Sequence, residues 1–202
     1  MAVNNIQFTR VEVQVVRYLF KHCKDKYNAR QLARLLDLNH AHINKLCNLL
    51  LSKQLLKKEE IGNSAYFSFD YDNVLAIKFM EYLLSLEENE FPRWLAVVLH
   101  SLKKFNSYIK LGLVFGSSIK HSRFNDVDVL LMYDKNRSKE IMKIKEEIIN
   151  SQLIEQPIRY VEIAEKDIVL SRDDKIFYNI ISDSLVFYNP GQYVEVIKKC
   201  RK

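Results

Sequence analysis

Apolar residues recur with a helical period in three segments near the start of the chain. Between Thr9 and Cys23 they occupy one face of a helix, and Thr9 with Glu12 has the spacing of a capping box. A second helix, "ARQLARLLDL", follows Asn28, and a third, "HAHINKLCNLLLSK", follows Asn39. Asparagine is a favoured N-cap, so each of these two residues marks the start of a helix. The pattern predicts three helices with a tight turn between the last two.

The pattern then changes from a helical period to alternation. "QLLKKEE" leads through a turn signal at 61–64 into the alternating segment "AYFSF", which predicts a β-hairpin. A broadly apolar helix is expected over Tyr71–Leu86, and Pro92 is placed to begin another over Arg93–Phe105. We therefore expect an N-terminal domain over residues 1–70, a connecting helix within 71–90 and a second domain over 91–202.

The second domain is predicted to be a small mixed sheet with helices. Buried strands are expected at Tyr108–Gly116 and Asp126–Met132, and an amphipathic helix at Ser138–Gln152. "IRYVEIAE" reads as a third strand, and another helix, a short strand near Leu185–Tyr188 and a closing helix complete the chain. The fold class is therefore α+β.

Charge and cysteine content narrow the class of protein. The formal net charge is +6, and residues 1–70 hold 11 Lys and Arg against 6 Asp and Glu, whereas residues 71–202 hold 20 against 19. A basic segment favours a polyanionic partner, although a modest surplus of lysine is also typical of a solvated surface. The three cysteines form no CxxC pair, and neither a signal peptide nor an apolar run of about 18 residues is present. We expect a cytoplasmic protein with no membrane partner.

Two carboxylates interrupt the apolar strand at 126–132. Asp126 and Asp128 lie on the same face because strand side chains alternate, and they are about 7 Å apart along the strand. Such a pair repels unless a cation lies between the two groups. Mg²⁺ accepts one or two carboxylates and completes its shell with water and substrate phosphates. The strand therefore predicts a site for metal-assisted phosphoryl transfer.

The phrase "VFGSS…NDVDVLL" resembles the signature of the DNA-polymerase-β-like nucleotidyltransferase superfamily. Gly116 and Ser117 match its Gly-Ser positions, and Asp126 and Asp128 match its metal-binding pair. Glu162 is the best candidate for the third catalytic carboxylate, ahead of Glu165 and Asp167. The resemblance implies a Mg²⁺-dependent enzyme, with two ions and ATP as the first candidate among nucleoside triphosphates. Further nucleotide-binding candidates lie in the segment after the Gly-Ser pair: Ser118, Lys120 and Arg123.

The chain also departs from the superfamily pattern. Only eight residues separate Ser117 from Asp126, Lys120-His121 replaces the usual Arg-Gly, and the third position holds Glu instead of Asp. An inactive domain used for nucleotide sensing or dimerisation is therefore an alternative to a transferase.

The order helix, helix, tight turn, helix, hairpin resembles the winged helix-turn-helix domains of transcription regulators. In such domains the third helix enters the major groove, where Asn can bond adenine and Lys can reach guanine or phosphate. Winged helices also serve as docking or dimerisation modules, so a role without DNA contact stays open. The candidate DNA-binding residues are the outward positions of the third helix: His40, His42, Asn44, Lys45 and Asn48.

The combination of the two domains resembles prokaryotic, especially archaeal, nucleotidyltransferase proteins with a helix-turn-helix. It implies transfer of a nucleotide monophosphate to a protein or RNA acceptor, with the winged helix selecting or docking a target. The alternative is a DNA-binding regulator with an inactive transferase-like domain. The apolar helix at 71–86 is expected either to pack on the second domain or to pair with its copy in a homodimer.

Overall fold

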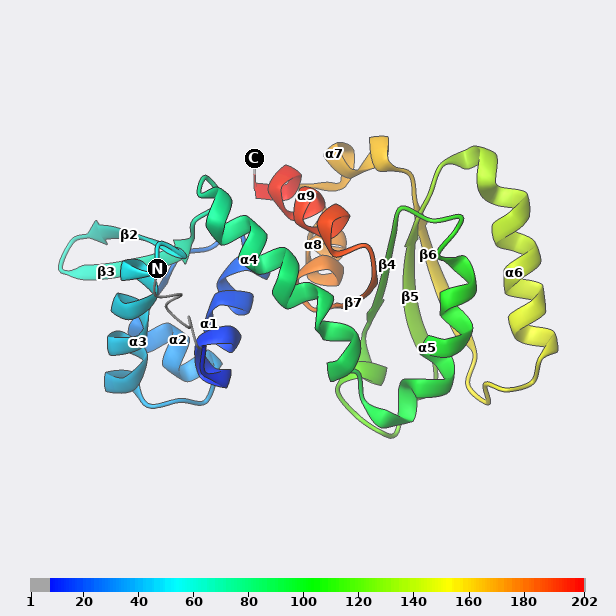
Figure 1. The fold of residues 1–202 in the computed structure, drawn as a ribbon, viewed down its shortest axis with the longest axis horizontal. Coiled ribbons are helices and arrows are strands. Elements are labelled where there is room, and N and C mark those ends of the chain that lie inside the picture. The colour runs from blue at the N-terminus through cyan, green and yellow to red at the C-terminus, as the bar shows by residue number, and fades with distance from the viewer. Residues whose placement is uncertain (1–7, 202) are drawn as a thin grey trace, which may run out of the picture. The chain divides into compact units, whose positions relative to one another are not determined.

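The structure is a computed structural model that describes residues 8–201, apart from the side chain of Val169. The chain divides between Leu83 and Leu84 into two compact units, each with its own sheet. This division falls inside the segment 71–90 that the sequence assigns to the connection. Mixed helices and sheets confirm the α+β class (Figure 1). Within the described residues, every helix is too short or too polar to cross a membrane.

The first helix of the N-terminal unit, α1 (Arg10–Lys21), begins with the predicted capping box. The Glu12 amide donates to Thr9 Oγ1 at 3.2 Å, and the Thr9 amide donates to Glu12 Oε2 at 2.6 Å. Lys53 Nζ also lies 2.5 Å from Glu12 Oε1. Burial alone would raise the pKa of Glu12, but the hydrogen bonds from Lys53 and Thr9 outweigh it and lower that pKa. The cap therefore also links α1 to the residue that ends the third helix.

The helices α2 (Ala29–Leu35) and α3 (His40–Ser52) begin at the predicted caps. The Asn28 side chain accepts from the Gln31 amide, and the Asn39 side chain accepts from the His42 amide. The inward face of α3 is buried, as its apolar spacing predicts. This face consists of Ile43, Leu46, Cys47 and Leu50.

The predicted hairpin is present as β2 (Leu56–Ile61) and β3 (Ser64–Phe69). Gly62 lies in the two-residue connection with φ of 59°, a conformation that glycine adopts without steric cost. A short strand that the sequence analysis missed, β1 (Tyr27–Asn28), pairs with β3 and gives the order β1-β3-β2. Two residues are too few to show alternation, so this strand had no pattern to reveal it.

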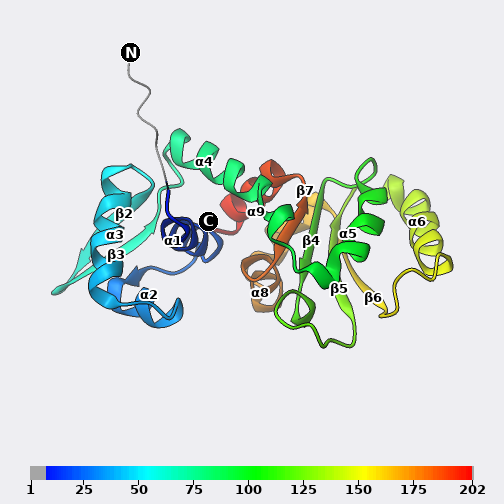
Figure 2. The same ribbon diagram turned by 60° about the horizontal axis from the view of Figure 1, so that its bottom comes forward.

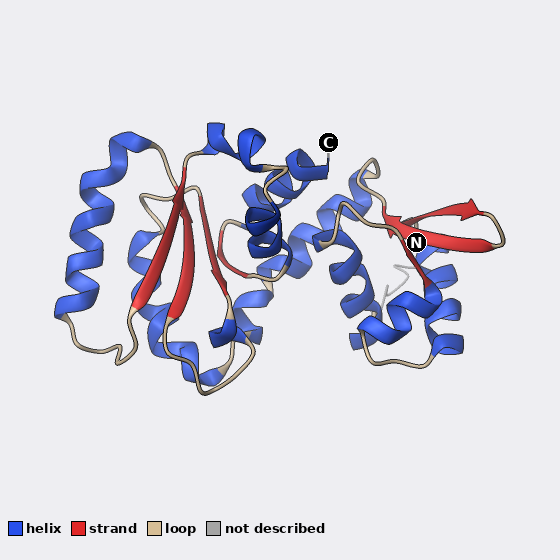
Figure 3. Ribbon diagram, turned by 180° about the vertical axis from the view of Figure 1, so that it is seen from behind, coloured by secondary structure: helices blue, strands red, loops and turns tan. Residues whose placement is uncertain are grey.

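The C-terminal unit contains a four-stranded sheet in the order β6-β5-β4-β7. Strand β4 (Leu111–Phe115) is antiparallel to β5 (Val127–Met132) and to β7 (Leu185–Tyr188), whereas β5 and β6 (Ile158–Ile163) are parallel (Figure 3). The parallel pair needs a crossover, and α6 (Ser138–Asn150) supplies it.

Helices cover both faces of this sheet, as Figure 2 shows. One face packs against α5 (Ala96–Leu102) and α6, and α9 (Pro190–Arg201) contacts β4 and β7. Strand alternation divides β5 between the two sides. The members of the core shared with α5 and α6 include Val127, Val129, Leu131, Ile141, Ile144 and Ile148.

The C-terminal unit differs from the prediction at the ends of several strands and helices. Strand β4 begins at Leu111, three residues after the predicted start. Strand β6 ends at Ile163, so "AE" lies outside it, and a 3₁₀ turn (Glu165–Asp167) leads into the short α7 (Ile168–Ser171). The predicted helix before β7 is α8 (Lys175–Ser182). The differences lie at element ends, where the apolar pattern carries little information.

Candidate functional site

Asp126 and Asp128 lie where β5 begins. Asp126 immediately precedes the strand, and its side chain is 14% exposed. Asp128 is the second residue of β5, between two valines that belong to the core shared with α5 and α6. Because side chains alternate, its carboxylate points to the opposite face of the sheet.

Gly116 lies directly against Asp128. It follows β4 with φ of 81° and ψ of −156°, a region that only glycine adopts readily. A Cβ atom placed on Gly116 would be 2.4 Å from Asp128 Oδ2. Two independent features therefore require glycine at this position: the backbone conformation and the close approach of the Asp128 carboxylate. The structure therefore brings together Gly116 and Asp128, which the sequence analysis assigns to one site.

The surroundings of Asp128 disfavour its charged form. Burial is the main cause that raises the pKa of Asp128, and the negative charge of Asp126 adds to it. The positive charge of Arg159 acts in the opposite direction. A divalent cation bound between the two carboxylates would stabilise their charged forms. It would offset both the cost of burying the charge on Asp128 and the repulsion between the two groups.

Arg159 is a site residue that the sequence analysis missed. In the parallel pairing of β5 and β6 it lies opposite Asp128, so the two side chains share a face of the sheet. Arg159 NH2 lies 2.9 Å from Asp126 Oδ2, although the Arg159 side chain is 72% exposed. An arginine in a strand next to an acid pair could have been noted, but only the register places it there.

Glu162, the predicted third carboxylate, does not join the acid pair. It lies opposite Leu131 in β6, so its side chain is on the face that packs against α5 and α6. There it accepts from the Tyr133 hydroxyl and forms an ion pair with Lys145 of α6. The prediction that Glu162 belongs to the site is therefore wrong. Its position in β6 directs the side chain to the face of the sheet opposite that of Asp128. The alternatives Glu165 and Asp167 lie beyond the strand end, and Glu165 pairs with Lys110 and Lys199.

The predicted phosphate-binding residues are in three different situations. Ser117 is exposed at the start of a 3₁₀ turn, and the Arg123 side chain is also exposed. Lys120 is exposed and lies 2.7 Å from Asp183. Ser118 does not fit its predicted role, because its side chain is fully buried and its hydroxyl donates to the Phe115 carbonyl of the same turn. Its carbonyl accepts from Trp94 Nε1 at 2.8 Å, so Ser118 fixes the turn.

The donor set fits one Mg²⁺ ion that also holds phosphate. Two aspartate carboxylates are the hard oxygen ligands that Mg²⁺ prefers, with water and phosphate oxygens completing six positions. No group of three or more His, Cys, Asp or Glu in the described residues could hold a metal by itself. The site can therefore supply two protein ligands for a metal and no third carboxylate.

The candidate nucleic-acid residues lie together in the N-terminal unit. His40, His42, Asn44, Lys45 and Asn48 are all exposed on α3, opposite its buried face. Arg30 and Arg34 of α2 are exposed as well, and α2 packs against α3. Neither arginine is among the residues predicted from the third helix, because both precede it in the chain.

The lysines of the hairpin are in ion pairs with nearby acids. Lys57 lies 3.2 Å from Asp70 and 2.5 Å from Asp72, and Lys58 lies 2.8 Å from Glu60. These carboxylates offset the charge that the hairpin could offer to a polyanion. The positive charge available for phosphate contacts is therefore greater on α2 and α3.

Comparisons of the chain with protein-family models, with curated proteins and with solved structures find no match.

Proposed function

We propose that the protein is a DNA-binding regulator whose C-terminal unit binds a nucleoside triphosphate with Mg²⁺ without transferring it. The N-terminal unit would be a winged helix-turn-helix, and the C-terminal unit a nucleotidyltransferase-like domain. The order of three helices and a hairpin supports the first assignment. The antiparallel pair β4–β5 with Gly116 at one strand end, Asp128 on the next and a parallel third strand supports the second.

Nucleotide binding is supported by the arrangement around Gly116. Asp126 and Asp128 can supply two metal ligands, and the exposed turn at Ser117 follows the glycine directly. A metal held by this pair would bridge to the phosphates of a triphosphate, which carry the remaining oxygens. Arg123, exposed in the connection to β5, can contact the same phosphates.

One observation carries the choice of a regulator over a transferase. The β6 position opposite Asp128 holds Arg159, and the carboxylate expected there lies on the other face as Glu162. A general base must be within hydrogen-bond reach of the hydroxyl that it activates. Without a third carboxylate, binding of a nucleotide is supported more strongly than attack on it.

A transferase is the second candidate, and the retained acid pair favours it. Burial and the charge of Asp126 raise the pKa of Asp128, which lies against a glycine that nothing larger can replace, and such an arrangement is typical of a site for metal chemistry. In that case the acceptor would be a protein hydroxyl or an RNA end. Catalysis would depend on alignment and charge neutralisation without a protein base.

The first experiment measures nucleotide binding and transfer with the full-length chain. ATP binding is followed by calorimetry with and without Mg²⁺, and α-³²P-labelled nucleotides are incubated with cell extract. We expect Mg²⁺-dependent binding that the Asp126→Asn/Asp128→Asn variant loses, and no labelled product. Glu146→Gln/Glu147→Gln is a matched control, since both residues are exposed on α6 and the charge change is the same.

Two results would overturn parts of this proposal. Label that moves onto a protein or RNA with the wild type, but not with the aspartate variant, would establish the transferase. Absence of ATP binding in the presence of Mg²⁺ would remove the nucleotide from both candidate functions.

The second experiment tests the DNA interface. A duplex selected from genomic fragments is titrated at several salt concentrations, because each phosphate contact contributes a slope of about 0.9 in log affinity against log salt. We expect Arg34→Ala/Lys45→Ala to reduce that slope by roughly 1–2, and Lys57→Ala/Lys58→Ala to change it little. A slope near zero for the wild type would instead support a protein-docking module.

A further inference from the structure

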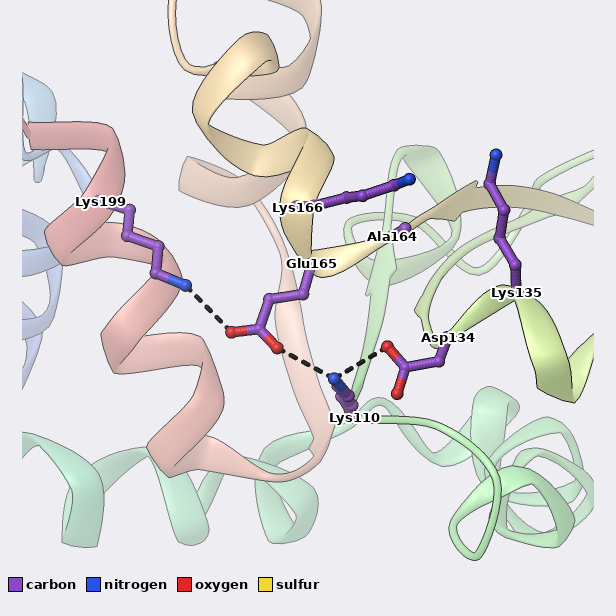
Figure 4. Close-up of a pocket in the computed structure, with 7 residues that line it drawn as sticks. All are labelled: Lys110, Asp134, Lys135, Ala164, Glu165, Lys166 and Lys199. Atoms are coloured by element: carbon purple, nitrogen blue, oxygen red, sulfur yellow. Dashed lines mark hydrogen bonds and ion pairs between the residues drawn. The ribbon is translucent and has the colours of Figure 1, made fainter.

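A polar cavity of about 540 Å³ lies at the other end of the sheet from Asp126 and Asp128. Its lining comes from the residues around the start of β4, from the segments after β5 and β6, and from α9 (Figure 4). Ala164 is the one apolar residue among those that line it. The lining consists of Lys110, Asp134, Lys135, Ala164, Glu165, Lys166 and Lys199.

A chain of ion pairs fixes one wall of the cavity. Lys110 Nζ lies 2.9 Å from Asp134 and 3.0 Å from Glu165, and Lys199 Nζ lies 3.0 Å from the other oxygen of Glu165. Hydrogen bonds from Lys110 and Lys199 lower the pKa of Glu165, and those to Asp134 and Glu165 raise the pKa of Lys110. The ion pairs therefore favour the charged forms of Glu165 and Lys110 and hold these two side chains in place.

The lining has more positive than negative charge. Four ammonium groups face two carboxylates, which leaves a net charge of +2. Lys135 and Lys166 are both exposed, and neither is drawn with an ion-pair partner in Figure 4. Lysine ammonium groups that line a concave surface raise the local concentration of anions.

We propose that this cavity binds a small phosphorylated anion with at least two negative charges, such as a polyphosphate or the phosphate chain of a nucleotide. The volume falls in the range of about 300–1,000 Å³ for small-molecule sites. Because six of the seven lining residues carry a charged group, phosphate groups are favoured over an aromatic base as the recognised part. Lys135 and Lys166 would bind the anion directly. Lys110 and Lys199, which are held by Glu165, would add to the positive electrostatic potential in the cavity.

This site does not depend on the proposed nucleotide site. Asp126 precedes β5 and Asp134 follows it, and eight residues of extended chain span roughly 26 Å. One phosphate chain therefore cannot contact both ends of the sheet at once. The two proposals can succeed or fail separately.

Calorimetric titration of the full-length chain with tripolyphosphate tests the proposal. EDTA is included to remove Mg²⁺, and the Asp126→Asn/Asp128→Asn background removes the other site. We expect measurable binding that Lys135→Ala/Lys166→Ala weakens about tenfold or more, as for the loss of hydrogen bonds to charged groups. Lys139→Ala/Lys143→Ala removes the same charge from exposed positions of α6 and should change the affinity less than about twofold.

A substitution that is expected to increase the affinity distinguishes an effect on binding from a loss of folding. Asp134→Asn removes one negative charge from the rim, so tripolyphosphate should bind severalfold more tightly. Parallel titration with ATP identifies the source, since tighter binding of ATP would indicate a nucleotide and equal binding a free polyphosphate. The proposal is overturned if the chain in the Asp126→Asn/Asp128→Asn background does not bind tripolyphosphate, if both lysine double variants lose affinity equally, or if Asp134→Asn fails to tighten binding.

Discussion

The two ends of the four-stranded sheet carry opposite charge. At the start of β5, two aspartates lie beside one arginine, whereas beyond its end four lysines face two carboxylates. At the lysine end Asp134 and Glu165 are in ion pairs, whereas at the aspartate end burial and the charge of Asp126 raise the pKa of Asp128. A carboxylate whose ionisation is disfavoured by burial and by a like charge is a candidate ligand for a cation.

The largest effect is expected from Gly116→Ala, which would disrupt the aspartate end alone. The strained backbone and the contact with Asp128 together should destabilise the C-terminal unit by about 2–5 kcal/mol. The chain has a single tryptophan, Trp94, bonded to the adjacent turn, so its fluorescence in a urea titration reports on this unit.

Gly62→Ala is the matched control for that substitution. Gly62 also has a positive φ, but its added Cβ meets nothing within 4 Å, so a cost of about 1–2 kcal/mol is expected in the N-terminal unit. The Trp94 transition should not move. Equal costs at the two glycines would mean that the contact with Asp128 is unimportant.

Next in size is Arg159→Asp, which would supply the carboxylate missing beside Asp128. Three carboxylates in place of two and a cation should raise Mg²⁺ affinity about tenfold or more, measured by calorimetry. Arg159→Ala removes only the competing cation and should give a smaller gain. Unchanged Mg²⁺ affinity in both variants would show that Arg159 does not limit the aspartate pair.

A smaller effect is expected from Asp128→Asn, measured without metal. Because the pKa of Asp128 is raised, chiefly by burial, its charged form destabilises the folded state at neutral pH. The neutral amide should therefore increase the free energy of unfolding by about 0.5–1 kcal/mol at pH 7. A loss of stability at pH 7 would argue that Asp128 is a structural residue.

The smallest effect is expected at the lysine end from Glu165→Gln, which should decrease the free energy of unfolding. Since Lys110 and Lys199 lower the pKa of Glu165, its contribution is present above the ordinary value of 4.5 and is lost as the pH falls through the folded value. With the side chain about one third exposed, the loss at pH 7 should be at most about 1 kcal/mol.

Unfolding at pH 7 and near pH 3 checks this sign. The difference between Glu165→Gln and the wild type should shrink at the lower pH. Glu155→Gln, at an exposed position, should change stability little at either pH. A deficit in Glu165→Gln that persists unchanged at low pH would refute the assigned role of the ion pairs.

Local sequence patterns were sufficient for much of the fold. The Thr9–Glu12 capping box, the asparagine caps and the hairpin turn depend on residues at most a few positions apart, and all are present. Gly116 and Asp128, which the structure places against each other, belong to one local motif. Strand β1 and the end of β6 were missed because neither gives a periodic signal.

The sequence by itself determined which residues of each strand share a face. "IRYVEI" places Arg159 and Val161 on one side and Tyr160 and Glu162 on the other, whichever way the strand is paired. Only the tertiary structure decided which of these faces meets Asp128. Pairing of Asp128 with Arg159 follows from packing Tyr160 and Ile158 toward the core under α5 and α6, a contact between segments far apart in the chain. A shift of the β6 register by one residue would have placed Glu162 on the face of Asp128 and Arg159 on the opposite face. The apolar pattern of a six-residue strand cannot fix that register.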